Sequence, residues 1–106
     1  NVKNSKLLSV VEVMENHLSN VLSLQDISII VGISPRHINR LFRKYLNQST
    51  MSFYKNLRLD LSQKLLSQSH LSVTEIALSS GFTSSSQFSQ TFRGKFGITP
   101  SKFKNM

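Results

Sequence analysis

The sequence predicts an all-α fold of about seven helices, arranged as two helix-turn-helix subdomains joined by a long linker helix. Apolar residues recur at helical spacing along the chain, and strand-like alternation does not. Serine-led capping boxes and glycines mark the starts and ends of short helices. One stretch of sequence also returns about fifty residues later. We expect the subdomains over residues 1–48 and 70–106, with the linker helix over 49–69.

The first predicted helix presents four apolar residues on one face, at steps of 4, 3 and 4: Leu7, Val11, Met14 and Leu18. Two short helices then begin at S-x-x-[DE] capping boxes, over residues 23–26 and 72–75, and end at Gly32 and Gly81. After each glycine another helix begins, at Ser34 with Pro35 in its first turn and at Ser84. These four helices make two helix-turn-helix units.

A longer helix is predicted between the units, from about Thr50 to Gln68. Its apolar residues step by four: Phe53, Leu57, Leu61 and Leu65. Thr99 and Pro100 open a last short helical turn near the end of the sequence.

The internal repeat relates the two units residue by residue. Gly32 corresponds to Gly81 at an offset of 49, and Arg43 corresponds to Arg93 at an offset of 50, so the second turn carries one extra residue. In the second helix of each unit, helical spacing predicts a buried side and an outward side. The predicted buried sides are Ile38, Leu41, Phe42 and Tyr45 in the first unit, and Phe88, Phe92 and Phe96 in the second.

The outward side of the first unit's second helix suits the major groove of DNA. Arginine pairs with guanine O6 and N7, and asparagine with adenine N6 and N7. Arg36, Asn39 and Arg40 are therefore candidate base-contacting residues, and Arg43 and Lys44 are candidate phosphate contacts. His37 is a further phosphate candidate, with a solvent-exposed or capping role as the alternative. A basic, solvated helix face would carry the same residue types.

The matching side of the second unit is rich in hydroxyl groups: Ser85, Ser86, Ser89, Gln90 and Arg93. Short hydroxyl side chains suit phosphate contacts and water-mediated base contacts. We therefore expect the first unit to set most of the base preference. Because the two units differ, one chain is expected to recognise an asymmetric site.

Composition narrows the classes of function. The 106 residues carry a net charge of +8, which favours a polyanionic partner such as DNA or an acidic membrane surface. The sequence has no cysteine, which excludes disulfides and thiolate metal sites, and its three histidines are far apart, so no metal is expected. The five acidic residues form no catalytic pair, so we expect neither an enzyme nor a cofactor.

No membrane-spanning run or signal peptide is evident, and a cytoplasmic location is expected. The first residue, Asn1, suggests a piece of a longer protein.

Several motifs together resemble the AraC/XylS family of transcription regulators. They are Gly81-Phe82, Phe88-Ser89-x-x-Phe92-Arg93, Phe96-Gly97-x-x-Pro100 and Phe103-Lys104, with Leu57-Arg58-Leu59 and Lys64-Leu65-Leu66 in the linker. The resemblance implies a seven-helix DNA-binding domain that places its third and sixth helices in successive major grooves. It also implies an activator more often than a repressor, contact with RNA polymerase, and an effector bound by a domain absent from this chain. Residues 34–46 and 71–82 are also similar to the subgroup with a DJ-1/PfpI-like N-terminal domain.

The length of the linker favours the same interpretation. A helix of about 18 residues is about 27 Å long, and two grooves on one face of DNA lie about 34 Å apart. Two other classes of function remain as alternatives. One is a helical module that contacts RNA polymerase or another protein without specific DNA binding. The other is a basic bundle on a membrane surface, which the lack of a sustained amphipathic helix with exposed bulky apolar residues disfavours.

Overall fold

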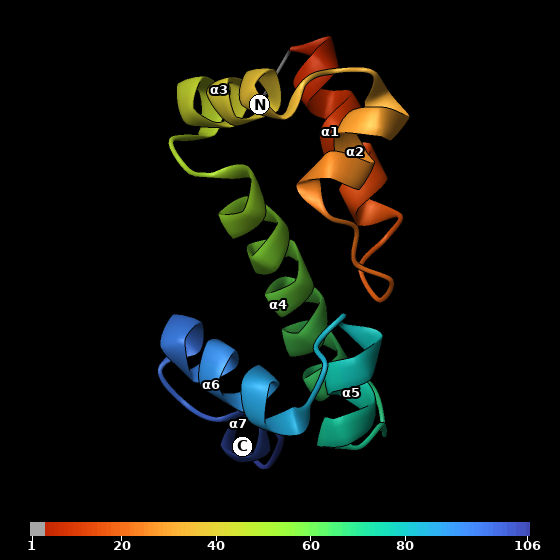
Figure 1. Ribbon diagram of the computed structural model, residues 1–106. Helices are drawn as coiled ribbons and strands as arrows, with labels where there is room; N and C mark the ends of the chain where they lie inside the picture. Colours follow the sequence, from red (N-terminus) through yellow and green to blue (C-terminus); the bar gives the residue numbers. More distant parts are fainter. Residues whose placement is uncertain (1–3) are drawn as a thin grey trace. The chain divides into compact units, whose positions relative to one another are not determined.

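The computed structural model describes residues 4–106, and these form seven α-helices and no strand (Figure 1). The predicted all-α class is therefore confirmed. The helices are α1 (Ser5–Glu15), α2 (Leu24–Val31), α3 (Pro35–Leu46), α4 (Thr50–Gln68), α5 (Val73–Ser79), α6 (Ser85–Phe96) and α7 (Pro100–Lys104). Among the described residues no helix is both long and apolar enough to cross a membrane.

The chain divides into two compact units, each with its own hydrophobic core. The first unit ends at Leu57, and the second is Arg58–Met106. The boundary falls inside α4, so this helix supplies its first part to one core and its remainder to the other. In the first unit α1 packs against α2 and α3, and in the second unit α6 packs against α5 and α7 (Figure 1).

The core of the first unit differs in detail from the predicted stripe. Leu7 and Met14 are buried as expected, but the third buried residue of α1 is Val10, and Val11 is only half-buried. α1 ends at Glu15, so Leu18 packs on the core from the loop that follows. Tyr54 of α4 completes this core, and its buried hydroxyl accepts a hydrogen bond from the Leu22 amide at 3.1 Å and donates one to the His17 carbonyl.

The core of the second unit is built on aromatic rings. Phe88 stands 5.1 Å from Phe82 and 5.6 Å from Phe92, measured between ring centroids. Phe92 also contacts Phe96 at 4.5 Å and Phe103 at 5.8 Å. Such edge-on and tilted ring pairs contribute about 0.5–1.5 kcal/mol each beyond the burial of their area. The buried apolar residues that α4 adds to this core are Leu59 and Leu66, and neither belongs to the predicted step-of-four stripe.

Both predicted capping boxes are present and start α2 and α5. The Ser23 hydroxyl accepts from the Asp26 amide at 3.1 Å, and the Ser72 hydroxyl accepts from the Glu75 amide at 3.1 Å. In each box the carboxylate in turn accepts a hydrogen bond from the amide of the capping serine. The two short helices therefore begin where the sequence predicts.

A left-handed glycine follows each of these helices. Gly32 has φ 71° and Gly81 has φ 84°, a conformation that L residues with a side chain rarely adopt. After the glycine, the amide of Ile33 donates to Ser28, and that of Phe82 donates to Ala77, each bond spanning five residues. The two helices therefore end with the same hydrogen bond, although α5 itself stops at Ser79, two residues before Gly81.

Candidate nucleic-acid interface

The recognition helix of the first unit is α3. Ser34 caps its start by accepting from the His37 amide at 3.2 Å, and Pro35 occupies the first turn, where an amide hydrogen is not needed. Ile38 and Phe42 are fully buried and Leu41 nearly so. The prediction that Tyr45 also lies on this buried side is wrong, because 43% of its surface is exposed. The last turn of α3 therefore rests on the half-buried Leu46 instead.

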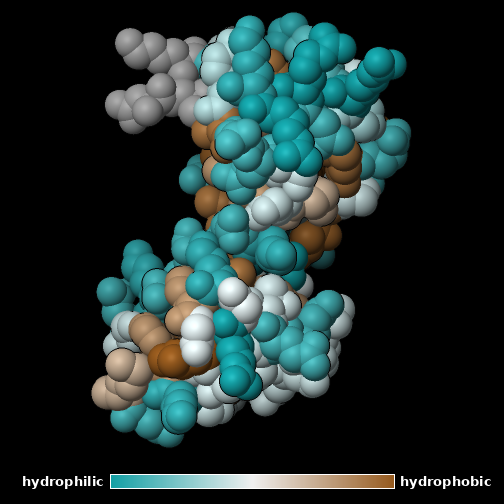
Figure 2. All heavy atoms as spheres, turned by 90° about the vertical axis from the view of Figure 1, so that its left-hand side faces the viewer, coloured by the Kyte–Doolittle hydropathy of each residue, from teal (hydrophilic) through white to brown (hydrophobic). Residues whose placement is uncertain are grey.

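The opposite side of α3 carries the predicted polar residues. Five of them are exposed to solvent: Arg36, Asn39, Arg40, Arg43 and Lys44. No acidic residue lies in α3, and the ion pair between Lys95 and Asp60 involves none of its basic residues. The four cations of α3 consequently have no carboxylate partner in the described part of the chain. Figure 2 shows the hydrophilic surface that covers the first unit on the face drawn there.

Asn39 differs from its basic neighbours because its side chain is held by another helix. Its Oδ1 accepts a hydrogen bond of 2.5 Å from Oγ1 of Thr50, the first residue of α4. Thr50 itself is fully buried, whereas Asn39 is exposed. The position of the Asn39 amide is therefore fixed from the protein side.

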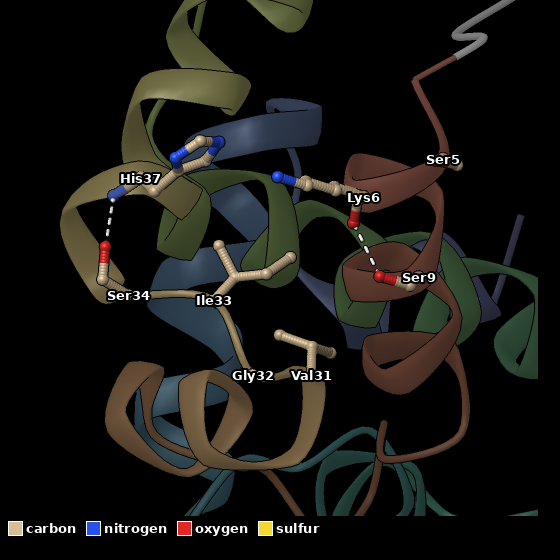
Figure 3. Close-up of a pocket in the computed structure, with 8 residues that line it drawn as sticks. All are labelled: Ser5, Lys6, Ser9, Val31, Gly32, Ile33, Ser34 and His37. Carbon is tan, nitrogen blue, oxygen red and sulfur yellow. Dashed lines mark hydrogen bonds between the residues drawn. The ribbon is translucent and has the colours of Figure 1, made fainter.

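His37 borders a hollow of about 430 Å³ at the start of α3 (Figure 3). The opposite wall is formed by α1, and Lys6 extends its ammonium group toward the His37 ring. Ser5 and Ser9 add hydroxyl groups on the α1 side, although Ser9 already donates to the Lys6 carbonyl at 2.7 Å. The rim of this hollow is thus polar and basic, on the same end of α3 as Arg36.

The recognition helix of the second unit is α6. Like α3 it has twelve residues, and it begins 50 residues after α3, at Ser85 in place of Pro35. Ser84 caps it by accepting from the Gln87 amide at 3.1 Å, and Phe88 and Phe92 fix its buried side. Phe96 is half-buried and packs on the same core.

The outward side of α6 is less exposed and less basic than that of α3. Ser86, Gln90 and Arg93 are exposed, whereas Ser85 and Ser89 are half-buried. The Ser85 hydroxyl already shares a hydrogen bond of 2.9 Å with the Thr74 hydroxyl of α5. Arg93 is the only cation among the predicted residues of this helix. Lys95 also lies in α6, but it is paired with Asp60 at 3.0 Å.

Three residues at these surfaces were not predicted from the sequence. Lys6 lies on α1, far along the chain from α3, and only the folded chain brings it beside His37. Gln87 accepts hydrogen bonds from the Thr83 amide and hydroxyl, at 3.1 and 3.0 Å. The repeat pairs Thr50 with Pro100, so the sequence does indicate that Thr50 begins a helix. Its bond to Asn39 joins two helices, and helical periodicity does not reveal it.

Comparison with known proteins identifies the family of the chain. The family model for a helix-turn-helix domain matches residues 27–106. The transcriptional regulator CdhR of Pseudomonas aeruginosa is 38% identical over 101 residues, which are 95% of this chain and 30% of that protein. The chain thus spans less than a third of the length of this curated relative.

Two solved structures have the same fold. An AraC-type transcriptional regulator from Chromobacterium violaceum is 39% identical and superposes with a TM-score of 0.89, covering 94% of this chain and 89% of that one. The DNA-binding domain of AdpA, solved in complex with a target DNA, is 25% identical with a TM-score of 0.89, covering 96% of this chain and 92% of that one. The chain therefore belongs to the AraC-type family of helix-turn-helix domains found in transcription regulators.

Proposed function

We propose that this chain is the DNA-binding part of a bacterial transcription regulator and that it binds duplex DNA at a specific sequence. In this proposal residues 1–48 and 70–106 are the two binding subdomains, residues 49–69 link them, and α3 and α6 enter adjacent major grooves. The observation that carries the proposal is the exposed side of α3 in an AraC-type domain. There an asparagine lies beside four cations that have no carboxylate partner among residues 4–106.

The chemistry of this surface supports DNA over other polyanions. An α-helix of about 10–12 Å diameter fits a major groove about 12 Å wide. Arg36 and Arg40 carry planar forks that match the two acceptors of guanine, and Arg43 and Lys44 lie one to two turns further along the helix, where phosphates are the expected partners. The solved complex of AdpA with its target DNA supports the same assignment at 25% identity.

The two subdomains are proposed to contribute unequally. Arg36, Asn39 and Arg40 would set most of the base preference. Ser85, Ser86, Ser89, Gln90 and Arg93 would supply phosphate contacts and water-mediated base contacts, because hydroxyl groups donate and accept over short range without a fixed fork. His37 is proposed as a phosphate contact, since it shares the rim of the basic hollow with Lys6.

Quantitative binding tests this function. The chain is titrated against a duplex selected from a random pool and against a shuffled duplex of equal length, at several salt concentrations. We expect a strong preference for the selected duplex and a linear fall of log affinity with log salt. Lys64→Ala, which removes an exposed charge of α4, is the control for Arg40→Ala. Equal affinity for both duplexes would leave only nonspecific binding and would refute the proposal.

The regulator as a whole is proposed to be a cytoplasmic activator rather than an enzyme. Contact with RNA polymerase and control by an effector in another domain follow from the family resemblance. A protein contact has one specific support in the structure: Ile29 and Ile30 of α2 expose 70% and 56% of their surfaces. In transcription assays on the full regulator, the double variant Ile29→Ser and Ile30→Ser is expected to keep DNA affinity and lose activation. Full activation by this variant would show that the exposed isoleucines of α2 do not make the protein contact.

A further inference from the structure

The bond between Asn39 and Thr50 constrains which groups α3 offers to a base. The donor is the Thr50 hydroxyl and the acceptor is Oδ1 of Asn39. Because Thr50 has no exposed surface, the amide oxygen of Asn39 is turned toward the protein. The amide nitrogen keeps both of its hydrogens free to donate, whereas one of the two lone pairs of the oxygen is already used by Thr50.

The bond from Thr50 competes with the usual asparagine–adenine pair for the amide oxygen. In that pair the side chain donates to adenine N7 and accepts from the adenine N6 amino group, so both ends of the amide must face the base. A donor alone is matched by N7 of either purine and by guanine O6, which are acceptors. The bond from Thr50 should therefore make Asn39 discriminate less sharply between adenine and guanine than a free asparagine does.

We infer that Thr50 is a positioning residue that favours the donor role of Asn39, so that the base pair facing Asn39 is selected as a purine rather than specifically as adenine. The inference rests on the proposed function, because it requires α3 to contact base edges. Thr50 touches no DNA in this arrangement and acts only through the Asn39 amide.

The repeat provides an internal comparison. Fifty residues after Asn39 and Thr50 the chain has Ser89 and Pro100, and Pro100 begins α7 as Thr50 begins α4. Proline has no hydroxyl, so the second unit cannot form the equivalent of the hydrogen bond between Thr50 and Asn39. A hydroxyl group is therefore not needed to begin the equivalent helix of the second unit.

Selection from a random duplex pool tests the inference with the chain and four variants. The wild type is expected to enrich either purine at one position. Thr50→Val and Thr50→Ala release the amide oxygen, and each is expected to shift that position toward adenine over guanine by about fivefold or more. Thr50→Ser retains the hydroxyl and should keep the wild-type profile. Asn39→Ala should abolish the preference at that position and make Thr50→Val silent there.

Thermal unfolding of each variant separates this effect from loss of structure, and the alanine variant stands in if the valine variant fails to fold. An unchanged profile in Thr50→Val and Thr50→Ala would overturn the inference, as would changes at positions that Asn39→Ala leaves alone. If the folded wild type enriches no sequence at all, the proposed function fails and the inference fails with it. If the wild type and the Thr50 variants enrich the same sequences, the inference about Thr50 is refuted and the proposed function stands.

Discussion

The guanidinium of Arg58 in α4 donates two hydrogen bonds to the turn that follows α5. Its Nη2 lies 2.7 Å from the Gly81 carbonyl, and its Nε lies 3.0 Å from the Ser80 carbonyl. The same group stacks on the Phe82 ring, 4.3 Å from the ring centroid. These two carbonyls belong to the turn between α5 and α6, so one side chain satisfies both of them and holds the turn that leads into α6.

Replacing Arg58 should loosen the second unit selectively. Hydrogen bonds from charged groups contribute about 1.5–3 kcal/mol each, so Arg58→Ala is expected to lower the stability of this unit by about 3 kcal/mol. Native-state hydrogen exchange of the α5 and α6 amides measures this loss, with α2 and α3 of the first unit as the internal control. Arg58→Lys keeps the charge without the planar fork and should recover only part of the loss. Full recovery by lysine would show that charge alone suffices.

Ser80 offers the opposite effect in the same turn. Its side chain is buried, and its hydroxyl has no hydrogen-bond partner among the described residues. Burying such a group costs about 1–3 kcal/mol, so Ser80→Ala is expected to stabilise the second unit by about 1 kcal/mol. Ser62 is the matched control, because it is equally buried but donates to the Leu59 carbonyl at 2.6 Å. Urea unfolding that ranks Ser62→Ala above Ser80→Ala would contradict this prediction.

Glu75 should make the stability of the second unit depend on acidity. The hydrogen bonds from the Ser72 amide, 2.9 Å away, and from the Ser72 side chain lower the pKa of the Glu75 carboxyl below its ordinary value of 4.5. The ionised form thus stabilises the folded state above about pH 4.5, and this stabilisation is lost as the pH falls through the lowered pKa.

The variant Glu75→Gln tests this dependence because glutamine can still cap the helix but does not titrate. Urea midpoints are compared between about pH 6 and pH 3, across the range where glutamate carboxyls titrate. The difference between wild type and variant should shrink as the pH falls. Parallel curves for the two proteins would mean that Glu75 contributes nothing to the acid sensitivity of α5.

Two glycines should respond to alanine with opposite signs. Gly32 has φ 71°, and no described atom outside its own neighbourhood lies within 4 Å of the point where a Cβ would stand. The cost of Gly32→Ala therefore comes from backbone conformation alone and should be about 1 kcal/mol. Gly94 lies inside α6 with equal space around it, and Gly94→Ala should gain about 0.5–1 kcal/mol from helix propensity. Thermal melts of both variants measure the two changes, and equal shifts would show that α6 does not gain from alanine at this position.

The elements of this fold were predictable because their signals are local. The capping boxes at Ser23 and Ser72 and the glycine turns act within a few residues, and the structure has each of them. Predictions that depend on packing were less accurate. Helical spacing assigned Tyr45 to the buried side, but 43% of its surface is exposed, and Leu46 packs on the first core at the end of α3 instead.

The candidate interface shows the same limit. The exposed side of α3 follows from periodicity, and Arg36, Arg40 and Arg43 lie where the spacing places them. The bond from Thr50 to Asn39 links two helices, so no pattern within α3 could indicate it. The sequence therefore predicts which side chains are available to a partner, and the structure adds how one of them is oriented.

The two recognition helices should contribute unequally to DNA binding. Arg40 and Gln90 occupy equivalent positions 50 residues apart, as do Asn39 and Ser89. Loss of a fork that pairs with guanine costs about 1–3 kcal/mol, so Arg40→Ala should weaken binding by this amount and relax specificity at one position. Ser89→Ala removes one half-buried hydroxyl and should cost less, because a single neutral hydrogen bond contributes about 0.5–1.5 kcal/mol.

Phosphate contacts should behave differently from both. Arg43→Ala and Arg93→Ala remove equivalent exposed cations from the two helices, and each is expected to weaken binding to all sequences alike while lowering the salt slope by about 1. Fluorescence anisotropy titrations against the selected duplex and its single-base variants separate the two kinds of effect. If Ser89→Ala proves more damaging than Arg40→Ala, base preference is set by α6, and the hydroxyl groups there make direct contacts that their low exposure does not suggest.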